Sequence, residues 1–498
     1  MPSVRRWGGA NATAAVAFAL ALAAATPSSA QVTGTPVLPI PDPLTDAPEF
    51  EGQAATAKPI RAGKIPRHPF MAPNGRSNIH GDAFQSDTYR GLGPLGNETS
   101  ASSALFFREC ASKTFDSDGR LITICVGLDL PMLAMLDPGT LEPLATFPLP
   151  PRQVTGADNP FTDFSGGGYF YLDHRDRVVA PTTTRHIYVV RQTDAPGFEL
   201  ARDIDLTDHV GADDKLISAL PDWDGRLWFA STDGVVGYVG RRAGKVRTLD
   251  LGEHNGNSFT VDERGSVYVV TDAALYRLRA GRGQARVVWR RGYANDGEIK
   301  PGQTQAGSGT TPTMMGGGRW VTITDNADPI RVLVLQRARR PDGRRVICRE
   351  RIFERGASST DQSLIAFDRS IVAENNYGYS VAEVESGGDG IEPGLTRIDV
   401  ESDGRGCDTV WESDERAPSV VPKLALGSGL VFTYTLPQEH DAWYLTAIDF
   451  RTGETVYRRQ AGGGLGFNNN YAPVTIALDD TGYVGVLGGV TRLRDGGG

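Results

Sequence analysis

The strongest constraint on the fold of this chain is a hairpin of two apolar strands that recurs eight times. Each copy holds a tight turn with Asp-Gly, Gly-Gly or a similar pair, which is typical of β-hairpins. The turns lie about 40–60 residues apart, near the length of one propeller blade or somewhat above it. The copies read "ALFFRECASKTFDSDGRLITICV", "GYFYLDHRDRVVAPT", "SALPDWDGRLWFAST", "SFTVDERGSVYVVTD", "TPTMMGGGRWVTITD", "SLIAFDRSIVAEN", "PKLALGSGLVFTYT" and "PVTIALDDTGYVGVLG".

A second, more polar hairpin follows seven of the eight copies, whereas only "GVTRLRD" follows the eighth. The chain is therefore one strand short of eight complete four-stranded units. A propeller fills such a gap with a strand from its N-terminal segment, which leaves no open sheet edge in the ring. The pattern predicts an all-β, eight-bladed β-propeller, or a seven-bladed one if one hairpin is an insertion. We expect residues 76–93 to supply the closing strand.

The polar hairpins resemble the repeat of a known family. "AIDFRTGETVY" (Ala447–Tyr457) is similar to the repeat of quinoprotein-type propellers, an Ala-x-Asp-x-x-Thr-Gly turn that ends in Trp, with Tyr457 in the Trp position. "LDPGTLE" is a weaker copy, and "RIDVESDGRGCDTVW" ends in Trp411. The resemblance implies a quinoprotein-like propeller (PQQ-type repeat) of an exported, bacterial-type protein. It says little about activity, because propellers include both enzymes and interaction modules.

The first 30 residues have the form of a signal peptide. Arg5 and Arg6 precede "ATAAVAFALALAAA", which is short for a membrane span, and "SSA" precedes Gln31. Residues 31–75 are Pro-rich and aperiodic, which predicts an extended arm, and residues 76–498 would form the propeller. We therefore expect a secreted or periplasmic protein with no membrane span after processing.

The charge of the chain limits the partners that it can have. The formal net charge is −9, and an acidic balance argues against nucleic acid as the main partner. A small-molecule ligand or another extracytoplasmic partner fits better, and we expect a monomer.

The four cysteines predict two disulfides in an oxidising compartment. A two-residue turn centred between Ser117 and Asp118 sets Cys110 opposite Cys125 in the first hairpin, at a spacing that a disulfide can bridge. Cys348 and Cys407 fall on outer strands of consecutive blades and could join them.

The two faces of the predicted disc differ in their loops. The turns within the inner hairpins are short, whereas the loops that lead into the innermost strands, and those that leave the second strands, are long and rich in amides and carboxylates. Such loops converge near the axis, so we expect a polar site there. The candidate ligand-binding residues are Asn469, Asn470, Gln362, Asn375 and Asp325, and the candidate catalytic acids or bases are Asp361 and Glu374. The alternative is that these side chains only cap their own loops.

Oxygen-bearing side chains near the strand ends make calcium the most plausible metal. The candidate metal ligands are Asp325, Asn326 and Glu374, with Asp361, Asn375 and Asn470 also on this face. His186, His209, His254 and His440 map to the same face, but zinc needs three or four converging ligands. "FDSDGR" and "PDWDGR" resemble parts of a calcium loop and are interpreted as hairpin turns.

Several signatures of known chemistry are missing from the sequence. No Gly-x-Ser-x-Gly and no Cys-x-x-Cys-His occurs, which disfavours an ordinary serine hydrolase and a c-type haem. No two cysteines are adjacent, unlike in many quinoprotein alcohol dehydrogenases, which makes pyrroloquinoline quinone doubtful. Two hypotheses remain: a small-molecule enzyme of quinoprotein-like or metal-assisted type, or a non-catalytic propeller that binds a protein, a polysaccharide or a cell-wall component.

Overall fold

The computed structural model describes residues 46–73, 75–127, 130–152, 161–163, 165–241 and 244–496. The expected signal peptide and the first part of the expected arm lie outside these residues. The described residues belong to one compact unit. They are almost entirely β-strand and turn, with one short helix, α1 (Val381–Glu385), and one 3₁₀ turn, η1 (Leu465–Phe467).

The described strands form eight sheets, which we number as blades in chain order. Blade 1 holds β4 (Lys113–Phe115), β5 (Leu121–Cys125), β6 (Met132–Leu136) and β7 (Pro143–Pro148). Blade 2 holds β8 (Tyr171–Leu172), β9 (Val178–Pro181), β10 (His186–Gln192) and β11 (Phe198–Asp205). Blade 3 holds β12 (Leu216–Pro221), β13 (Leu227–Ser231), β14 (Val235–Val239) and β15 (Val246–Asp250). Blade 4 holds β16 (Thr260–Val261), β17 (Ser266–Val270), β18 (Ala274–Ala280) and β19 (Ala285–Gly292).

The second half of the ring repeats this plan. Blade 5 holds β20 (Thr313–Met315), β21 (Trp320–Thr324), β22 (Arg331–Gln336) and β23 (Val346–Arg351). Blade 6 holds β24 (Ile365–Phe367), β25 (Ser370–Glu374), β26 (Leu395–Val400) and β27 (Cys407–Ser413). Blade 7 holds β28 (Lys423–Ala425), β29 (Leu430–Thr435), β30 (Trp443–Asp449) and β31 (Thr455–Gly462), flanked by β1 (Phe50–Gly52) and β2 (Thr88–Tyr89). Blade 8 holds β32 (Val474–Ile476), β33 (Gly482–Val486), β34 (Gly489–Arg494) and β3 (Ser100–Leu105).

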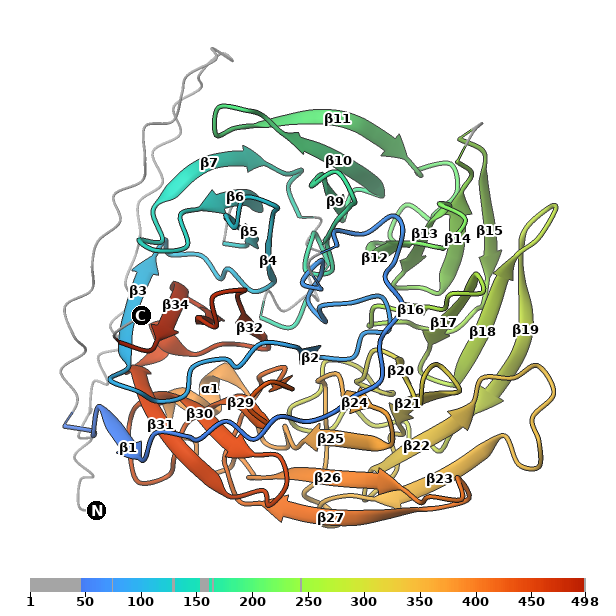
Figure 1. The fold of residues 1–498 in the computed structure, drawn as a ribbon. Coiled ribbons are helices and arrows are strands. Elements are labelled where there is room, and N and C mark those ends of the chain that lie inside the picture. The colour runs from blue at the N-terminus through green and yellow to red at the C-terminus, as the bar shows by residue number, and fades with distance from the viewer. Residues whose placement is uncertain are drawn as a thin grey trace, which may run out of the picture. The chain divides into compact units, whose positions relative to one another are not determined.

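The sheets stand in a ring, with the short first strands toward the centre and strands such as β11, β19 and β27 at the rim (Figure 1). The prediction of an eight-bladed propeller is confirmed, and the seven-bladed alternative is excluded. Burial follows the radius: β5 and β17 are buried along their whole length, whereas the rim strand β7 alternates between half-buried and exposed residues. Apolar side chains fill the spaces between neighbouring blades; Phe115 of blade 1 packs against Tyr483 of blade 8, for example.

The strand that closes the ring is β3, not the segment 76–93 that the sequence suggested. All six residues of β3 pair antiparallel with β34, from Ser100 opposite Arg494 to Leu105 opposite Gly489. The sequence of β3, "SASSAL", consists of small and hydroxyl side chains with little β preference, so its pattern gave no strand signal. The prediction that an N-terminal strand closes the ring is correct, but the segment predicted to supply it, residues 76–93, was wrong.

Residues 76–93 run instead beside the innermost strands. Thr88 and Tyr89 form β2, which pairs parallel with β28 at the inner edge of blade 7. Residues 76–78, 80–81 and 83–89 are buried. The segment before them contacts the propeller as well, since the backbone N–H groups of Lys58 and Ile60 donate to the carbonyls of Ser428 and Leu426. The domain boundaries at 30 and 75 stay a prediction.

Four inner hairpins share one turn that an aspartate organises. In blade 1 the Asp116 Oδ1 accepts hydrogen bonds from the backbone N–H groups of Asp118 and Arg120, at 3.0 and 2.9 Å. The same pair of bonds recurs in blades 2, 3 and 4, where the acceptors are Asp173, Asp222 and Asp262. "FDSDGR" and "PDWDGR" are therefore hairpin turns, as predicted, because their aspartate oxygens bind the backbone.

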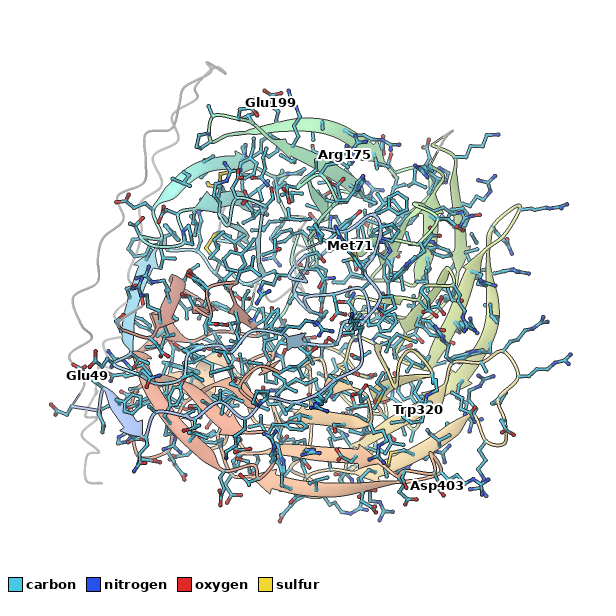
Figure 2. All side chains as sticks on the ribbon, viewed as in Figure 1. Glu49, Met71, Arg175, Glu199, Trp320 and Asp403 are labelled. Carbon is cyan, nitrogen blue, oxygen red and sulfur yellow. A yellow bond between two sulfur atoms is a disulfide. The ribbon has the colours of Figure 1, made fainter. Side chains whose placement is uncertain are left out.

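Both predicted disulfides are present, Cys110–Cys125 and Cys348–Cys407, and sulfur atoms are yellow in Figure 2. The predicted turn was one residue too short, because Lys113 pairs with Thr123. Glu109 nevertheless pairs with Val126, so three residues face two between these positions. This bulge restores the alignment of Cys110 with Cys125. The second disulfide joins β23 to β27, across blades 5 and 6.

Candidate functional site

The loops that lead into the innermost strands enclose a small axial pocket. It is lined by residues that directly precede β4, β8, β24, β28 and β32, together with Ile79 and His80 of the N-terminal segment. Its volume is about 40 Å³, which holds a few water molecules or the polar end of a larger molecule. The sequence-predicted residues Asp361, Gln362 and Asn470 all line it.

Three ionisable groups near this pocket have pKa values shifted to about 7. Burial raises the pKa of Glu109 to about 7, against the hydrogen bond from Asn470, and raises the pKa of Asp361 to about 7, against the hydrogen bonds from Thr304. Burial and the nearby Lys423 ammonium lower the pKa of Lys113 to about 7. The opposite charges of Glu109 and Lys113 attract each other, which lowers the pKa of Glu109 and raises that of Lys113 against the effect of burial. Such a cluster in a cleft is a candidate acid–base site.

Asp361 keeps one oxygen for a ligand or a proton. Its Oδ2 accepts hydrogen bonds from the Thr304 hydroxyl at 2.6 Å and the Thr304 backbone N–H at 3.2 Å. Its Oδ1 is buried and has no hydrogen-bond partner among the described residues. A buried oxygen without a partner costs free energy, which a ligand or a bound water would recover.

The Asn468–Asn470 run is bonded mostly within its own surroundings. Tyr379 donates its hydroxyl to the Oδ1 atoms of Asn468 and Asn470, at 3.1 and 2.9 Å. The Asn470 Nδ2 reaches Glu109 Oε2 at 3.0 Å. Asn470 and Tyr471 both have positive φ, 39° and 67°, a conformation that asparagine tolerates and tyrosine rarely adopts. Asparagine at 470 therefore serves both the turn and the Glu109 carboxylate.

The remaining predicted residues do not meet at this pocket. Asp325 Oδ1 accepts from the backbone of Ala327 and Arg331, and Asn375 bonds to backbone groups with both ends of its amide. Asn326 donates to Asn295, and Glu374 accepts from Asn376 and Thr433. Asn469 contacts Ala472 and Ser419. In these positions the side chains cap their own loops or join neighbouring ones.

A second buried group of charges, which the sequence did not suggest, borders the pocket through His80. The Lys423 ammonium donates to the Asp87 carboxylate and to the Ile79 carbonyl, the latter at 2.7 Å. His80 Nδ1 lies 3.1 Å from the same carboxylate, and its Nε2 lies 3.3 Å from Ser363 Oγ. Lys423 and Asp87 have no exposed side-chain surface. These contacts hold residues 79–87 at the innermost strands.

The predicted metal ligands Asp325, Asn326 and Glu374 bond to separate partners, as described above. Within the described ranges, no three His, Cys, Asp or Glu residues are arranged to hold a metal. His186 pairs with Asp203, and His440 pairs with Glu51, on blades 2 and 7.

The axial pocket does not fit the quinone that the repeat resemblance implies. Pockets that enclose small molecules have volumes of roughly 300–1,000 Å³, whereas this one has about 40 Å³. Ile79 and His80 line this pocket, and the hydrogen bond from Lys423 to the Ile79 carbonyl fixes them there. We therefore derive no chemistry through a quinone.

Comparison with known proteins supports the fold. No family model matches the chain. It is 28% identical over 312 residues to an uncharacterized protein of Archaeoglobus fulgidus, which is 56% of this chain, and it spans about three fifths (61%) of that protein's length. The quinohemoprotein alcohol dehydrogenase of Comamonas testosteroni aligns over 86% of this chain and 80% of its own, with 12% identity and a TM-score of 0.55.

Two further solved structures align with lower scores. BamB of Moraxella catarrhalis aligns over 75% of this chain and 94% of its own, with 11% identity and a TM-score of 0.46. A europium-containing methanol dehydrogenase aligns over 82% of this chain and 89% of its own, with 11% identity and a TM-score of 0.47. The alignment with the quinohemoprotein alcohol dehydrogenase is the one that shows a similar propeller fold. None of the described helices has the length and apolar character that crossing a bilayer requires.

Proposed function

We propose that this chain is an extracytoplasmic propeller enzyme that receives the polar end of a small molecule in the axial pocket and transfers a proton there. The observation that carries the proposal is that Glu109 and Asp361, from distant parts of the sequence, line one small pocket, and that Lys113 lies close enough to Glu109 for their charges to interact. Groups that titrate near pH 7 are suited to general acid–base catalysis.

The roles follow from the contacts of each group. Asp361 accepts or donates the proton through Oδ1, because its Oδ2 is already bonded to Thr304. Asn470 orients Glu109 through its amide nitrogen. Lys113 supplies a positive charge that favours a developing negative charge on the substrate. The two disulfides support an oxidising, extracytoplasmic location.

A second candidate function is non-catalytic binding of a protein, a polysaccharide or a cell-wall component. The hydrogen bonds of Asn468, Asn469 and Asn470 to neighbouring groups of the protein favour it, since these side chains then shape the surface instead of taking part in a reaction.

Turnover by the mature chain tests the proposal. A panel of esters, lactones, sugars and carbonyl compounds is assayed between pH 5 and 9 with the wild type, Asp361→Asn and Glu109→Gln. We expect activity on one class and a loss of about 100-fold or more in each variant. Asp408→Asn and Glu385→Gln remove exposed carboxylates and are matched controls. Full activity in Asp361→Asn contradicts the proposal, and saturable binding without turnover supports the second candidate.

A further inference from the structure

A larger pocket lies at the other end of the innermost strands, on the face of the short hairpin turns. It is lined by Met315–Gly317 at the β20–β21 turn, Phe367–Asp368 at the β24–β25 turn, Leu426 and Leu478. The opposite wall consists of residues 62–68 and several residues between 71 and 90. Its volume is about 380 Å³, within the range of pockets that bind small molecules. Residues 62–68 and several residues between 71 and 90 thus form one wall of this pocket, and part of the same segment lies beside the innermost strands.

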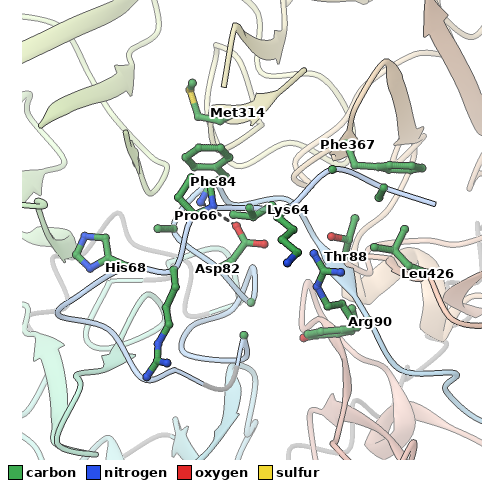
Figure 3. A pocket seen from close by; sticks show the side chains of 18 of the residues that line it. Lys64, Pro66, His68, Asp82, Phe84, Thr88, Arg90, Met314, Phe367 and Leu426 are labelled. Carbon is green, nitrogen blue, oxygen red and sulfur yellow. Dashed lines mark hydrogen bonds between the residues drawn. The ribbon is translucent and has the colours of Figure 1, made fainter. Parts of the chain in front are cut away.

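One part of the pocket wall is apolar. Its side chains come from both the N-terminal segment and the hairpin turns (Figure 3). The apolar lining residues include Ile65, Met71, Phe84, Met314, Phe367 and Leu426. Methionine and aromatic side chains adapt to flat or branched apolar groups.

Another part of the pocket lining carries three cations. Two carboxylates, Asp82 and Asp368, line the pocket as well, and Asp368 accepts from the Gly63 backbone N–H at 3.1 Å. The three cations are Lys64, Arg67 and Arg90, and all are exposed. Within the part of the chain that the structure describes, no ion pair or side-chain hydrogen bond involves any of these three side chains. Figure 3 shows the nitrogen ends of Lys64 and Arg90 turned toward the same part of the pocket. Unpaired like charges repel each other, and an anion between them relieves the repulsion.

Two charged groups deeper in the pocket, Asp82 and Arg76, already have partners. Asp82 accepts from the Phe84 backbone N–H at 2.8 Å and from the Ser86 hydroxyl at 2.5 Å. Arg76 is buried, donates to the Ala477 carbonyl at 3.1 Å, and stacks over Tyr89 at 4.8 Å. The cations left for a ligand are therefore the three at the rim.

We propose that this pocket binds a small amphiphilic organic anion, with its apolar body against Phe84, Met314 and Phe367 and its anionic group between Lys64 and Arg90. The apolar lining favours a ligand with an apolar body, and the unpaired cations favour one with a negative charge. A ligand that carries both satisfies the whole lining. The site is separate from the axial pocket, so each proposal can fail without the other.

Fluorescence titration with anilinonaphthalene sulfonate tests the site, since this aromatic anion brightens in apolar pockets. We expect one saturable site in the mature wild type and binding at least about 10-fold weaker in Lys64→Gln/Arg90→Gln, because both cations that face the sulfonate are removed. Asp82→Asn removes a negative charge from the lining and should tighten binding, roughly 3-fold. The matched control Lys245→Gln/Arg340→Gln removes two exposed cations outside the pocket lining.

Competitors separate the sources of such an anion. Displacement by decanoate but not by naphthoate identifies an acyl-chain ligand, and the reverse identifies an aromatic acid; either result supports the proposal. Displacement by inorganic phosphate as effective as by either organic anion contradicts the apolar half. Equal binding by the wild type, the pocket variant and the control, or no saturable binding by the wild type, overturns the site.

Discussion

The axial pocket and the cationic pocket lie at opposite ends of the same innermost strands, and they differ in how far their polar groups are bonded. The axial pocket has long, amide-rich loops but a volume of only about 40 Å³, because Asn468–Asn470 and Tyr379 bond to one another. The cationic pocket has short turns, a volume of about 380 Å³ and unpaired cations. The number of polar residues in the loops of a face therefore does not show how many polar groups remain to bind a ligand.

The buried ion pair between the two pockets should produce the largest effect. Lys423→Met leaves Asp87 buried without its ammonium partner, which is expected to lower the free energy of unfolding by about 3–5 kcal/mol. Urea denaturation followed by circular dichroism measures it. Lys245→Gln, an exposed control, should change it by less than about 0.5 kcal/mol. A loss below about 1 kcal/mol for Lys423→Met contradicts the view that this pair holds residues 79–87 at the axis.

Removal of each disulfide compares the stability contributed by a crosslink beside the axial pocket, Cys110–Cys125, with that contributed by a crosslink at the rim, Cys348–Cys407. The two disulfides enclose 15 and 59 residues, so loop entropy predicts losses of about 3 kcal/mol for Cys110→Ala/Cys125→Ala and about 4 kcal/mol for Cys348→Ala/Cys407→Ala. Each double variant is compared with the wild type by equilibrium unfolding in urea. The opposite order would show that local packing at Cys110 outweighs loop entropy.

The titration of the axial carboxyls should make stability depend on pH. Their pKa values are raised to about 7 in the folded state, so the native protein binds more protons than the unfolded chain between about pH 4 and 7. The free energy of unfolding should fall as pH rises through this window, by about 3–4 kcal/mol for each carboxyl. Glu109→Gln or Asp361→Asn should flatten the slope. An unchanged slope in both variants, as expected for the control Glu385→Gln, would contradict it.

The smallest effect on stability is expected at the cationic pocket. Arg90 is exposed and has no side-chain partner among the described residues, so Arg90→Gln should change the free energy of unfolding by less than about 0.5 kcal/mol. The thermal midpoint of the apo protein measures this. A clear destabilisation would identify Arg90 as a structural residue and would remove the contrast with Lys423.

The fold was largely predictable because each hairpin is a local pattern. The repeat predicts eight blades. The spacing within one hairpin predicts the Cys110–Cys125 pair, which forms because a bulge offsets a turn one residue longer than expected. The closing strand Ser100–Leu105 was not predictable, because its small side chains become a strand only through pairing with β34, nearly 400 residues later.

The site was predictable only in part. Asp361, Gln362 and Asn470 reach the axial pocket because each directly precedes an innermost strand. Glu109 was missed because its partner is distant: 361 residues separate it from Asn470. Lys113 and His80 were missed as well, because no pattern in the sequence marks them as buried near the axis. The caps at Asp325 and Asn375 follow from loop conformation, which the residue type alone does not determine. Their role as ligands, and that of Asn469, stays a prediction.

Carboxyl titration by NMR tests the acid–base character of the axial pocket most directly. The mature protein, labelled with carbon-13 at its aspartate and glutamate carboxyls, is titrated from pH 4 to 9, and Asp361→Asn and Glu109→Gln assign the two resonances. The account predicts two carboxyls with midpoints near pH 7, each missing from the corresponding variant. Midpoints for both groups near the ordinary value of about 4 would contradict it.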